Sequence, residues 1–496
     1  MLFFAFTTTA QPRFAAIFAD HVVLQRNREI DIWGFGAAPG QKLEVALGSS
    51  LVVAKVSRTG NWTARFPARS KNLQGVNLTL FVDGDAQAKL IDVVIGDVWL
   101  AAGQSNMQYP VSRMVKHLPQ GQAWAITTSL PLIRMRRIHD PIRPDPSSNS
   151  DDIHPGNWVP MSRQSVTKFS AVAAAFARSL SARINAPIGI IDVSWGGKPI
   201  EPFIPREAFR TPLLKRILRL SDEDALEKLQ QMPGGVIIRN AEGHPGAIYN
   251  ARMAPLTNFG LKGFLWYQAE SNCGRGEDPR FYRFKQQAMI EGWRAAWRDS
   301  DLPCYYVQLP SFAGATGWVR MREEQRLAQS VPHTAMAVTI DVRGQGIHPP
   351  DKLSVGRRLA HLAMAETYHW IKKEVRGPTY ASHRIKGNSV HVRFQNAESG
   401  LMVGFKPSVP PAEEFPGNPL LWFEVADADG RWHTAEARIE AGEVIVVANG
   451  VKQPVAVRYA CAPKPQGGNL YNRDGYPASP FCTDLKLLPW DDHGAK

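Results

Sequence analysis

The sequence predicts a parallel α/β sheet covered by helices on both faces, with a smaller β domain of sandwich type at each end of the chain. The chain has 496 residues, which is more than one hydrophobic core usually serves. Short segments of alternating apolar and polar residues fill both ends, and apolar strands that lead into helical segments fill the middle. We therefore expect domains at 14–92, 93–375 and 376–496.

The amino-terminal region reads as short strands, such as IDIWGFG, KLEVALG and NLTLFVDG, separated by turn signals such as Pro39-Gly40. This pattern is typical of a β-sandwich. Ahead of it, residues 1–13 begin with the apolar MLFFAFTTTA but lack the basic leader and full length of a secretory signal. We expect this segment to be a truncated signal.

In the middle region, DVVIGDVWLAAG, APIGIIDVSWGG, LKGFLWYQAE and LPCYYVQLP are apolar strands that alternate with helical segments. Such alternation predicts a parallel sheet buried on both faces. The segment 141–157 is rich in Pro, Ser, Asp and Asn and predicts a surface loop. After about residue 375, alternation returns in segments such as NSVHVRFQN and GEVIVVANG, which predicts the second β domain.

Composition argues against several classes of function. Lys and Arg (58) exceed Asp and Glu (45), for a net charge of +13, but the chain has no run of five basic residues and no basic and aromatic ladder. We predict a solvated basic surface and no nucleic-acid partner. No stretch approaches the roughly 18 apolar residues of a membrane-spanning helix. The four cysteines lack the close spacing of a zinc site, and Cys461 and Cys482 could form a disulfide or remain thiols.

The strongest local signal is GDVWLAAGQSNMQ, in which an apolar strand ends just before Ser105 and a helix follows. Open α/β sheets bind ligands at this edge, and a helix start offers N–H groups to a developing oxyanion. Ser105 could therefore be a nucleophile, or it could only cap the helix. Its surroundings do not match G-x-S-x-G, which argues against a peptidase or lipase of the α/β-hydrolase type.

A serine nucleophile requires a base, and His348 is the best placed of the 13 histidines. It lies after the strand TAMAVTID and before the helical KLSVGRRLA, so its loop can reach the sheet edge. His154 shares the His-Pro dipeptide and has a carboxylate nearby, but it lies in a polar loop and ranks below His348. The alternative for His348 is a structural role.

Two further strand ends carry polar or small residues. GFLWYQAESN ends in Gln268, Glu270 and Asn272, which could place an amide beside an oxyanion and a carboxylate beside an imidazole. The alternative is an ordinary hydrogen-bonded strand end. DVSWGG ends in Gly196 and Gly197, which let backbone N–H groups approach a ligand but are also common in turns.

Together these segments resemble the sialate O-acetylesterase family of SGNH-type carbohydrate esterases, and the match is collinear across nearly the whole chain. The segments that carry it include FADHVVLQRNREIDIWGFGAAPG, GDVWLAAGQSNM, PIGIIDVSWGGKPIE, GFLWYQAESN, IHPPDKLSVGRRLA and VAVRYACAPKPQGGNLYNRDGYPASPFCTD. The resemblance implies an SGNH-like sheet and a serine esterase that deacetylates carbohydrate. It also implies that no metal or organic cofactor is needed and that the protein works in the periplasm or outside the cell.

The resemblance implies that Ser105 is the nucleophile of an acetyl-enzyme mechanism and that His348 is first general base and then general acid. The backbone N–H of Ser105 would help to form the oxyanion hole. The residues expected around the oxyanion and the substrate are Gly196, Gly197, Asn272, Gln268 and Gln104.

The sequence departs from the family pattern just before the histidine. Related esterases usually have an Asp two or three residues before it, where this chain has Gln345 and Gly346. The residue that orients His348 is therefore open between Glu270, Asp341 and Gln345. Glu270 is the first choice, because this position supplies the acid in some related esterases.

Two milder departures flank the expected site. Ala269 stands where the family usually has glycine, and Lys198 stands where threonine is common. We predict that Lys198 favours an acidic sugar. O-acetylated sialic acid is the leading substrate and acetylated xylan the alternative. A carbohydrate-binding protein of the same fold with weakened catalysis is the alternative of a different class.

Overall fold

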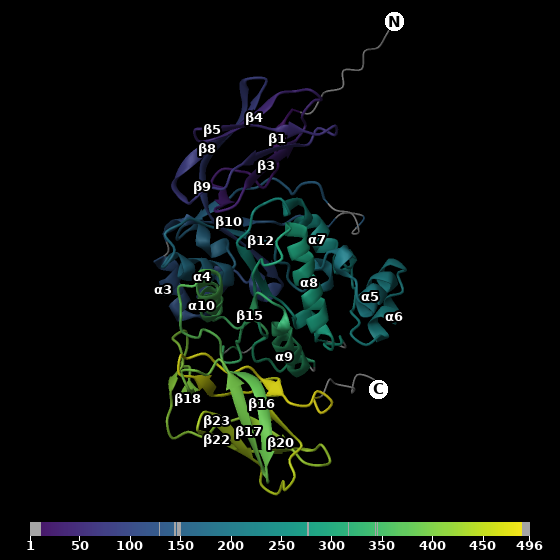
Figure 1. The fold of residues 1–496 in the computed structure, drawn as a ribbon, viewed down its shortest axis with the longest axis vertical. Coiled ribbons are helices and arrows are strands. Elements are labelled where there is room, and N and C mark those ends of the chain that lie inside the picture. The colour runs from purple at the N-terminus through teal and green to yellow at the C-terminus, as the bar shows by residue number, and fades with distance from the viewer. Residues whose placement is uncertain are drawn as a thin grey trace.

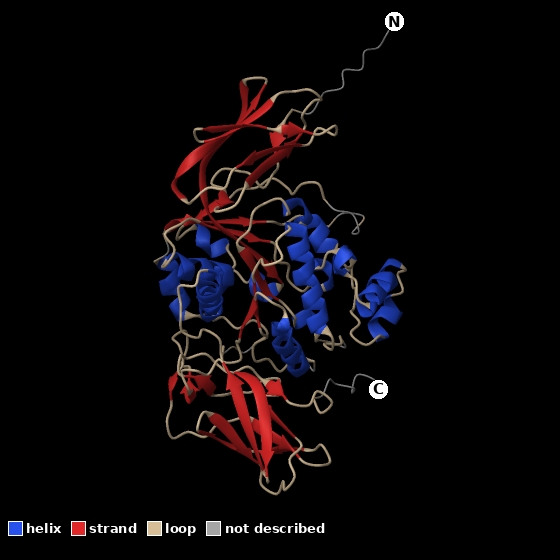
Figure 2. Cartoon of the chain, viewed as in Figure 1, coloured by secondary structure: helices blue, strands red, loops and turns tan. Residues whose placement is uncertain are grey.

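The computed structural model describes residues 11–127, 129–142, 145, 150–274, 277–315, 317–342, 344 and 346–488. Gln345, most of the expected signal segment and part of the loop expected at 141–157 lie outside the described residues. Helices gather in the middle of the molecule, and strands dominate both ends (Figure 2).

The middle of the chain forms a mixed sheet with the strand order β11-β10-β12-β9-β13-β14-β15. Its strands are β9 (Asp85–Gly103), β10 (Leu130–Arg137), β11 (Val159–Met161), β12 (Ile188–Asp192), β13 (Gly263–Tyr267), β14 (Cys304–Val307) and β15 (Thr334–Ala337). Neighbours from β10 to β15 pair in parallel, as the alternating pattern predicts, whereas β11 adds an antiparallel edge.

Helices cover both faces of this sheet (Figure 1). They are α1 (Ser105–Gln108), α2 (Val111–His117), α3 (Pro119–Ile126), α4 (Ala171–Ser181), α5 (Pro212–Asp222), α6 (Leu226–Gln231), α7 (Ala247–Arg252), α8 (Tyr282–Trp297), α9 (Trp318–Leu327) and α10 (Lys352–Leu362). Strand β13 illustrates the two cores. Phe264 and Trp266 pack with Trp293 of α8, whereas Leu265 and Tyr267 belong to the core that includes α4 and α10.

The amino-terminal strands divide between a separate four-stranded sheet and a group that joins the central sheet through β9. They are β1 (Arg13–Phe14), β2 (Val23–Gln25), β3 (Ile30–Phe35), β4 (Leu43–Leu47), β5 (Ser50–Val53), β6 (Lys55–Val56), β7 (Trp62–Phe66) and β8 (Asn72–Val82). β8 pairs with β9, so the domain boundary expected after residue 92 falls within one continuous strand. Residues 93–103 of β9 are all buried, whereas the residues before them are exposed or half-buried. The composition therefore changes where burial changes, although the strand does not end there.

The carboxy-terminal region forms three small antiparallel sheets, with orders β16-β17-β23-β22, β19-β18-β25 and β21-β20-β24-β26. Their strands are β16 (Thr379–Lys386), β17 (Ser389–Gln395), β18 (Leu401–Phe405), β19 (Glu413–Glu414), β20 (Phe423–Ala426), β21 (Trp432–Thr434), β22 (Glu436–Glu440), β23 (Glu443–Val447), β24 (Ala456–Tyr459), β25 (Leu470–Asn472) and β26 (Phe481–Cys482). The first strand begins close to the expected boundary at 376. The sandwich arrangement of these sheets remains a prediction.

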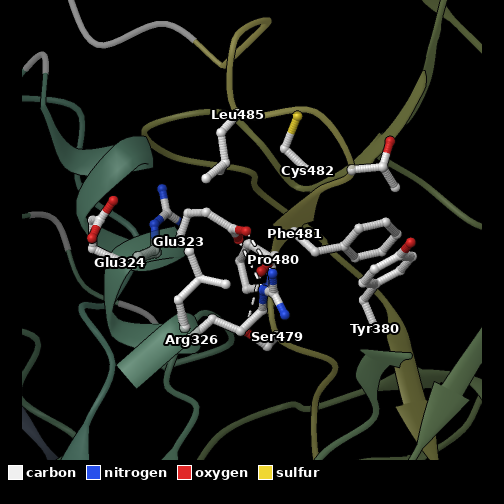
Figure 3. A network of polar contacts seen from close by, with 12 residues as sticks. Glu323, Glu324, Arg326, Tyr380, Ser479, Pro480, Phe481, Cys482 and Leu485 are labelled. Atoms are coloured by element: carbon white, nitrogen blue, oxygen red, sulfur yellow. Dashed lines mark hydrogen bonds and ion pairs between the residues drawn. The ribbon is translucent and has the colours of Figure 1, made fainter. Parts of the chain in front are cut away.

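Helix α9 forms part of the contact between the central and carboxy-terminal regions (Figure 3). Arg326 of α9 pairs with Glu323 at 2.6 Å and lies 5.8 Å above the ring of Tyr380 in β16. Tyr380 in turn stacks on Phe481 of β26 with ring centroids 4.9 Å apart. These contacts tie both ends of the carboxy-terminal region to the same helix.

The cysteines in this region are thiols in the structure. The Cys461 thiol donates to the Phe481 carbonyl at 3.2 Å, and the Cys482 thiol donates to the Asp484 carbonyl at 3.2 Å. Cys461 and Cys482 are therefore free, which is one of the two states that the sequence left open.

Candidate functional site

Ser105 lies directly after β9, at the first residue of α1, and is half-buried. Gly103 makes this turn possible, because its φ is +134° and a Cβ there would lie 2.1 Å from the Tyr267 carbonyl oxygen. As the first residue of a helix, Ser105 has a backbone N–H with no partner in the helical hydrogen-bond pattern. The strand and the turn thus present both a hydroxyl and an N–H group at the sheet edge.

His348 reaches this serine from the loop between β15 and α10. Its Nε2 lies 2.7 Å from Ser105 Oγ, within hydrogen-bond distance. Burial lowers the pKa of His348 to about 4, and the nearby charges of Lys352 and Arg113 contribute in the same direction. The imidazole is therefore neutral at pH 7 and can accept the serine proton.

Neither described candidate for the orienting acid bonds to this imidazole. Asp341 instead accepts two hydrogen bonds from Arg358, both 2.6 Å long. Glu270 Oε1 accepts from Asn106 Nδ2 at 2.5 Å. Gln345, the third candidate, lies outside the described residues.

Asn106 is the centre of a buried cluster that we call the Asn106 network: Asn106, Glu270, Ile347 and Lys352. Asn106 Nδ2 donates to Glu270 and also to the carbonyl of Ile347, at 2.9 Å, while Asn106 Oδ1 accepts from the Lys352 ammonium. Because Ile347 directly precedes His348, the amide of Asn106 ties the histidine loop to the residue next to Ser105.

Two charged members of the Asn106 network are fully enclosed. Burial lowers the pKa of Lys352 to about 7 although Glu270 opposes the shift, and the ammonium lies 5.0 Å from the ring of Tyr109 and 5.3 Å from that of Tyr267. Burial raises the pKa of Glu270, whose Oε2 has no hydrogen-bond partner among the described residues. Small changes around Lys352 can therefore change its charge near pH 7.

Sequence reasoning did not assign Asn106 and Lys352 to the site. The available signals were their positions, since Asn106 follows the candidate nucleophile and Lys352 lies four residues after the candidate base. Neither position alone distinguishes a buried partner from a solvated polar residue.

Gln104, on the other side of Ser105, belongs to a second cluster, the Gln104 network: Gln104, Gln268, Asn272, Glu201 and Lys285. Gln268 Nε2 donates to Gln104 at 3.1 Å and to Asn272 at 2.8 Å. Asn272 Nδ2 donates to Glu201 at 3.0 Å, and Glu201 pairs with Lys285 of α8 at 2.5 Å. The amide hydrogens that Asn272 could offer to an oxyanion are directed to Glu201 in this structure.

The two glycines of the expected oxyanion site differ in their bonding. The N–H of Gly196 donates to Gln108 Oε1 at 3.0 Å, and a Cβ on Gly196 would lie 3.5 Å from Ser105 Cβ. Gly197 is exposed with a φ of +72°, and its N–H has no hydrogen-bond partner among the described residues. Gly196 therefore packs against the serine, while Gly197 has the free donor.

The remaining residues singled out from the sequence have clear surroundings. Lys198 pairs with Glu242 at 3.3 Å, so its charge is partly offset before any acidic sugar arrives. Ala269 has a φ of +140°, the conformation for which the family's glycine is suited. His154 lies in the polar loop expected for it and pairs with Asp140 at 2.9 Å.

The described residues contain neither a metal-ligand cluster nor a membrane-spanning helix. No three His, Cys, Asp or Glu side chains in this part of the chain gather as potential ligands of a metal ion. No helix among the same residues combines the length and apolar character of a membrane span.

The chain is similar to known esterases over most of its length. The family model described as carbohydrate esterase, sialic acid-specific acetylesterase, matches residues 95–365, which is more than half of the chain. A crystal structure of a carbohydrate acetylesterase from Xanthomonas citri superposes with a TM-score of 0.82 and 30% identity, covering 96% of this chain and 100% of that one.

Curated relatives agree with this family. The sialate O-acetylesterase of Mus musculus is 28% identical over 427 residues, covering 74% of this chain and 75% of the relative. The sialate O-acetylesterase of Homo sapiens is 28% identical over 404 residues, covering 72% and 71%. The chain is therefore a carboxylic ester hydrolase, and it belongs to the sialic acid-specific acetylesterase family of carbohydrate esterases.

Proposed function

We propose that this protein is a serine O-acetylesterase of carbohydrates in which Ser105 attacks the acetyl carbonyl and His348 takes up the serine proton. The observation that carries the proposal is the 2.7 Å separation of Ser105 Oγ and His348 Nε2. His348 then returns the proton to the departing sugar hydroxyl, leaving an acetyl group on Ser105. Water activated by the same imidazole releases acetate.

The developing oxyanion is stabilised by the backbone N–H groups of Ser105 and Gly197. Gly197 is favoured over Gly196 because the Gly196 N–H already donates to Gln108. Asn272 would join these donors only if its amide turned away from Glu201. Each donor that points at the oxyanion is expected to contribute about 10²- to 10³-fold in rate.

Glu270 acts on His348 through Asn106 rather than by direct contact. The Asn106 amide joins the Glu270 carboxylate to the carbonyl of Ile347, and so holds the loop that carries the imidazole. The negative charge of Glu270 also offsets the positive charge that His348 gains during the reaction. Glu270 and Asn106 are therefore positioning residues in this mechanism.

O-acetylated sialic acid is the proposed substrate, because the matching family model and the mammalian relatives carry that specificity in their names. An acetylated plant polysaccharide such as xylan is the second candidate, since the Xanthomonas relative is described more broadly as a carbohydrate acetylesterase. The proposed place of action is the periplasm or the outside of the cell, where such glycans occur.

Acetate release from O-acetylated sialic acid and from acetylated xylan tests the proposal. Ser105→Ala and His348→Ala are expected to remove measurable release while the far-UV circular dichroism stays unchanged. The matched control is Ser389→Ala, a serine on β17 of the carboxy-terminal region, which should retain full activity. Release that persists in folded Ser105→Ala would overturn the proposed nucleophile, and the ratio of the two rates decides between the substrates.

A further inference from the structure

A polar cavity lies at the carboxy-terminal end of α10, away from Ser105. Its volume is about 410 Å³, and its walls come mainly from α10, the segment after that helix, the turn after α4 and the loop that follows β25. Its lining residues include Arg183, Arg357, His361, Trp370, Lys372 and Lys373. Lys352, at the other end of α10, belongs to the Asn106 network, and the nine positions to His361 correspond to about 13 Å along the helix axis.

The cations of this cavity exceed their carboxylate partners. Lys373 pairs with Asp474 at 3.1 Å, whereas Arg357 donates to a neutral carbonyl, that of Val409, at 2.5 Å. Arg183 and Lys372 are exposed, and neither has an ion-pair partner among the described residues. Three positive side chains therefore face one cavity without a matching carboxylate.

The pKa of His361 reflects the same excess of positive charge in the cavity. Its Nδ1 lies 2.7 Å from the Tyr476 hydroxyl, and burial lowers its pKa to about 4. The charges of Arg357, Lys373, Arg183 and Arg358 contribute in the same direction. The imidazole is therefore neutral at pH 7 and can take part in hydrogen bonding without adding to the charge.

An aromatic surface borders the cations. One face of the Trp370 ring stacks on Tyr368 with centroids 4.4 Å apart, and the side chain is 40% exposed. The electron-rich face of an indole attracts the weakly positive C–H groups of a sugar ring, and arginine is well suited to a carboxylate. We infer that this cavity is a second, non-catalytic binding site for a carboxylated sugar unit of a glycan.

This inference does not depend on the esterase mechanism, because binding at the cavity can be measured without turnover. The probe is glucuronate, a carboxylated pyranose, titrated by calorimetry into the full chain at low salt. Glucose and inorganic phosphate are titrated in parallel, since the first lacks the charge and the second lacks the ring. We expect glucuronate to bind more tightly than either.

Three variants locate this binding. The double variant Arg183→Gln/Lys372→Gln removes two exposed cations and is expected to weaken glucuronate binding about fivefold. Trp370→Ala is expected to weaken glucuronate binding while leaving phosphate binding unchanged. Lys71→Gln, an exposed lysine of the amino-terminal region, is the matched control and should bind as the unaltered protein does. Hydrolysis of a small aryl acetate should be equal in all of them, because none of these residues touches Ser105 or His348.

Two results would overturn the inference. Equal affinity for glucuronate in the double variant and in the unaltered protein would show that the cavity is not the binding site. Phosphate binding as tight as glucuronate binding, with no effect of Trp370→Ala, would reduce the site to a simple oxyanion site and remove the sugar from the assignment.

Discussion

Ser105 is flanked by the two residues that anchor the two buried networks, and these networks differ in how their charges are matched. In the Gln104 network, the amides of Gln268 and Asn272 have partners at both oxygen and nitrogen, and the carboxylate of Glu201 meets the ammonium of Lys285. In the Asn106 network, no ion pair joins Glu270 to Lys352 among the described residues; each contacts Asn106 instead, and the pKa of Lys352 lies near 7.

This difference suggests that one network stabilises the fold and the other adjusts the charges around His348. Removing one partner of a buried ion pair such as Glu201 and Lys285 leaves the other charge buried and unpaired, which is strongly destabilising. Groups with displaced pKa values are typical of sites where charge changes during function. We therefore expect damage to the Gln104 network to appear mainly in stability, and damage to the Asn106 network mainly in rate and pH dependence.

The largest expected effect is on stability and comes from Lys285→Met. The substitution leaves the Glu201 carboxylate fully buried without its cation, so the free energy of unfolding should fall by about 3–5 kcal/mol. Urea denaturation measures this change. The double variant Glu201→Gln/Lys285→Met removes both charges and should regain part of the loss. A fall no larger than that of an exposed lysine would show that the pair is not buried as described.

We expect Asn106→Ala to act mainly on kcat and less on the free energy of unfolding. It breaks the hydrogen bonds from Asn106 to Glu270 and to the carbonyl before His348, so kcat for acetate release should fall about 10²-fold through loss of base positioning. The matched comparison is Gln268→Ala, in the Gln104 network. For this variant we expect the main loss in the thermal unfolding temperature rather than in kcat. Equal rate and stability losses in both variants would remove the distinction between the networks.

Lys352→Met tests how far the Lys352 cation lowers the pKa of His348. The proposed mechanism requires neutral His348, so activity should be lost as the pH falls through the pKa of that residue, about 4. Removing the Lys352 cation removes one of the influences that lower this pKa, and the acidic limb of kcat/KM should move to higher pH. An inflection near pH 7, where Lys352 itself titrates, should also disappear. An unchanged profile would mean that burial and Arg113 set the pKa of His348 without a contribution from Lys352.

The Ser105 and His348 part of the site could be predicted because it depends on local patterns. Runs of buried apolar residues identify β9 and β13, and the polar residues after them necessarily meet at one sheet edge. The Asn106 network could not be predicted in the same way. Its contacts join Asn106 to Glu270 and to Lys352 across long stretches of chain, and no periodicity encodes which amide faces which carboxylate. The family pattern pointed to Glu270, but not to its contact with Asn106.

The smallest expected effect is a gain, and it comes from the strand end that joins the two networks. Ala269 lies between Gln268 and Glu270 with a φ of +140°, where an L-residue is strained and glycine is not. Ala269→Gly should raise the free energy of unfolding by about 0.5–1 kcal/mol, because relief of this strain exceeds the added entropy of the unfolded chain. The matched control is Ala296→Gly in helix α8, where glycine should instead destabilise the protein by about 1 kcal/mol. If both substitutions destabilised the protein equally, the backbone at Ala269 would carry no strain, and the turn that leads into Glu270 would be as relaxed as an ordinary strand end.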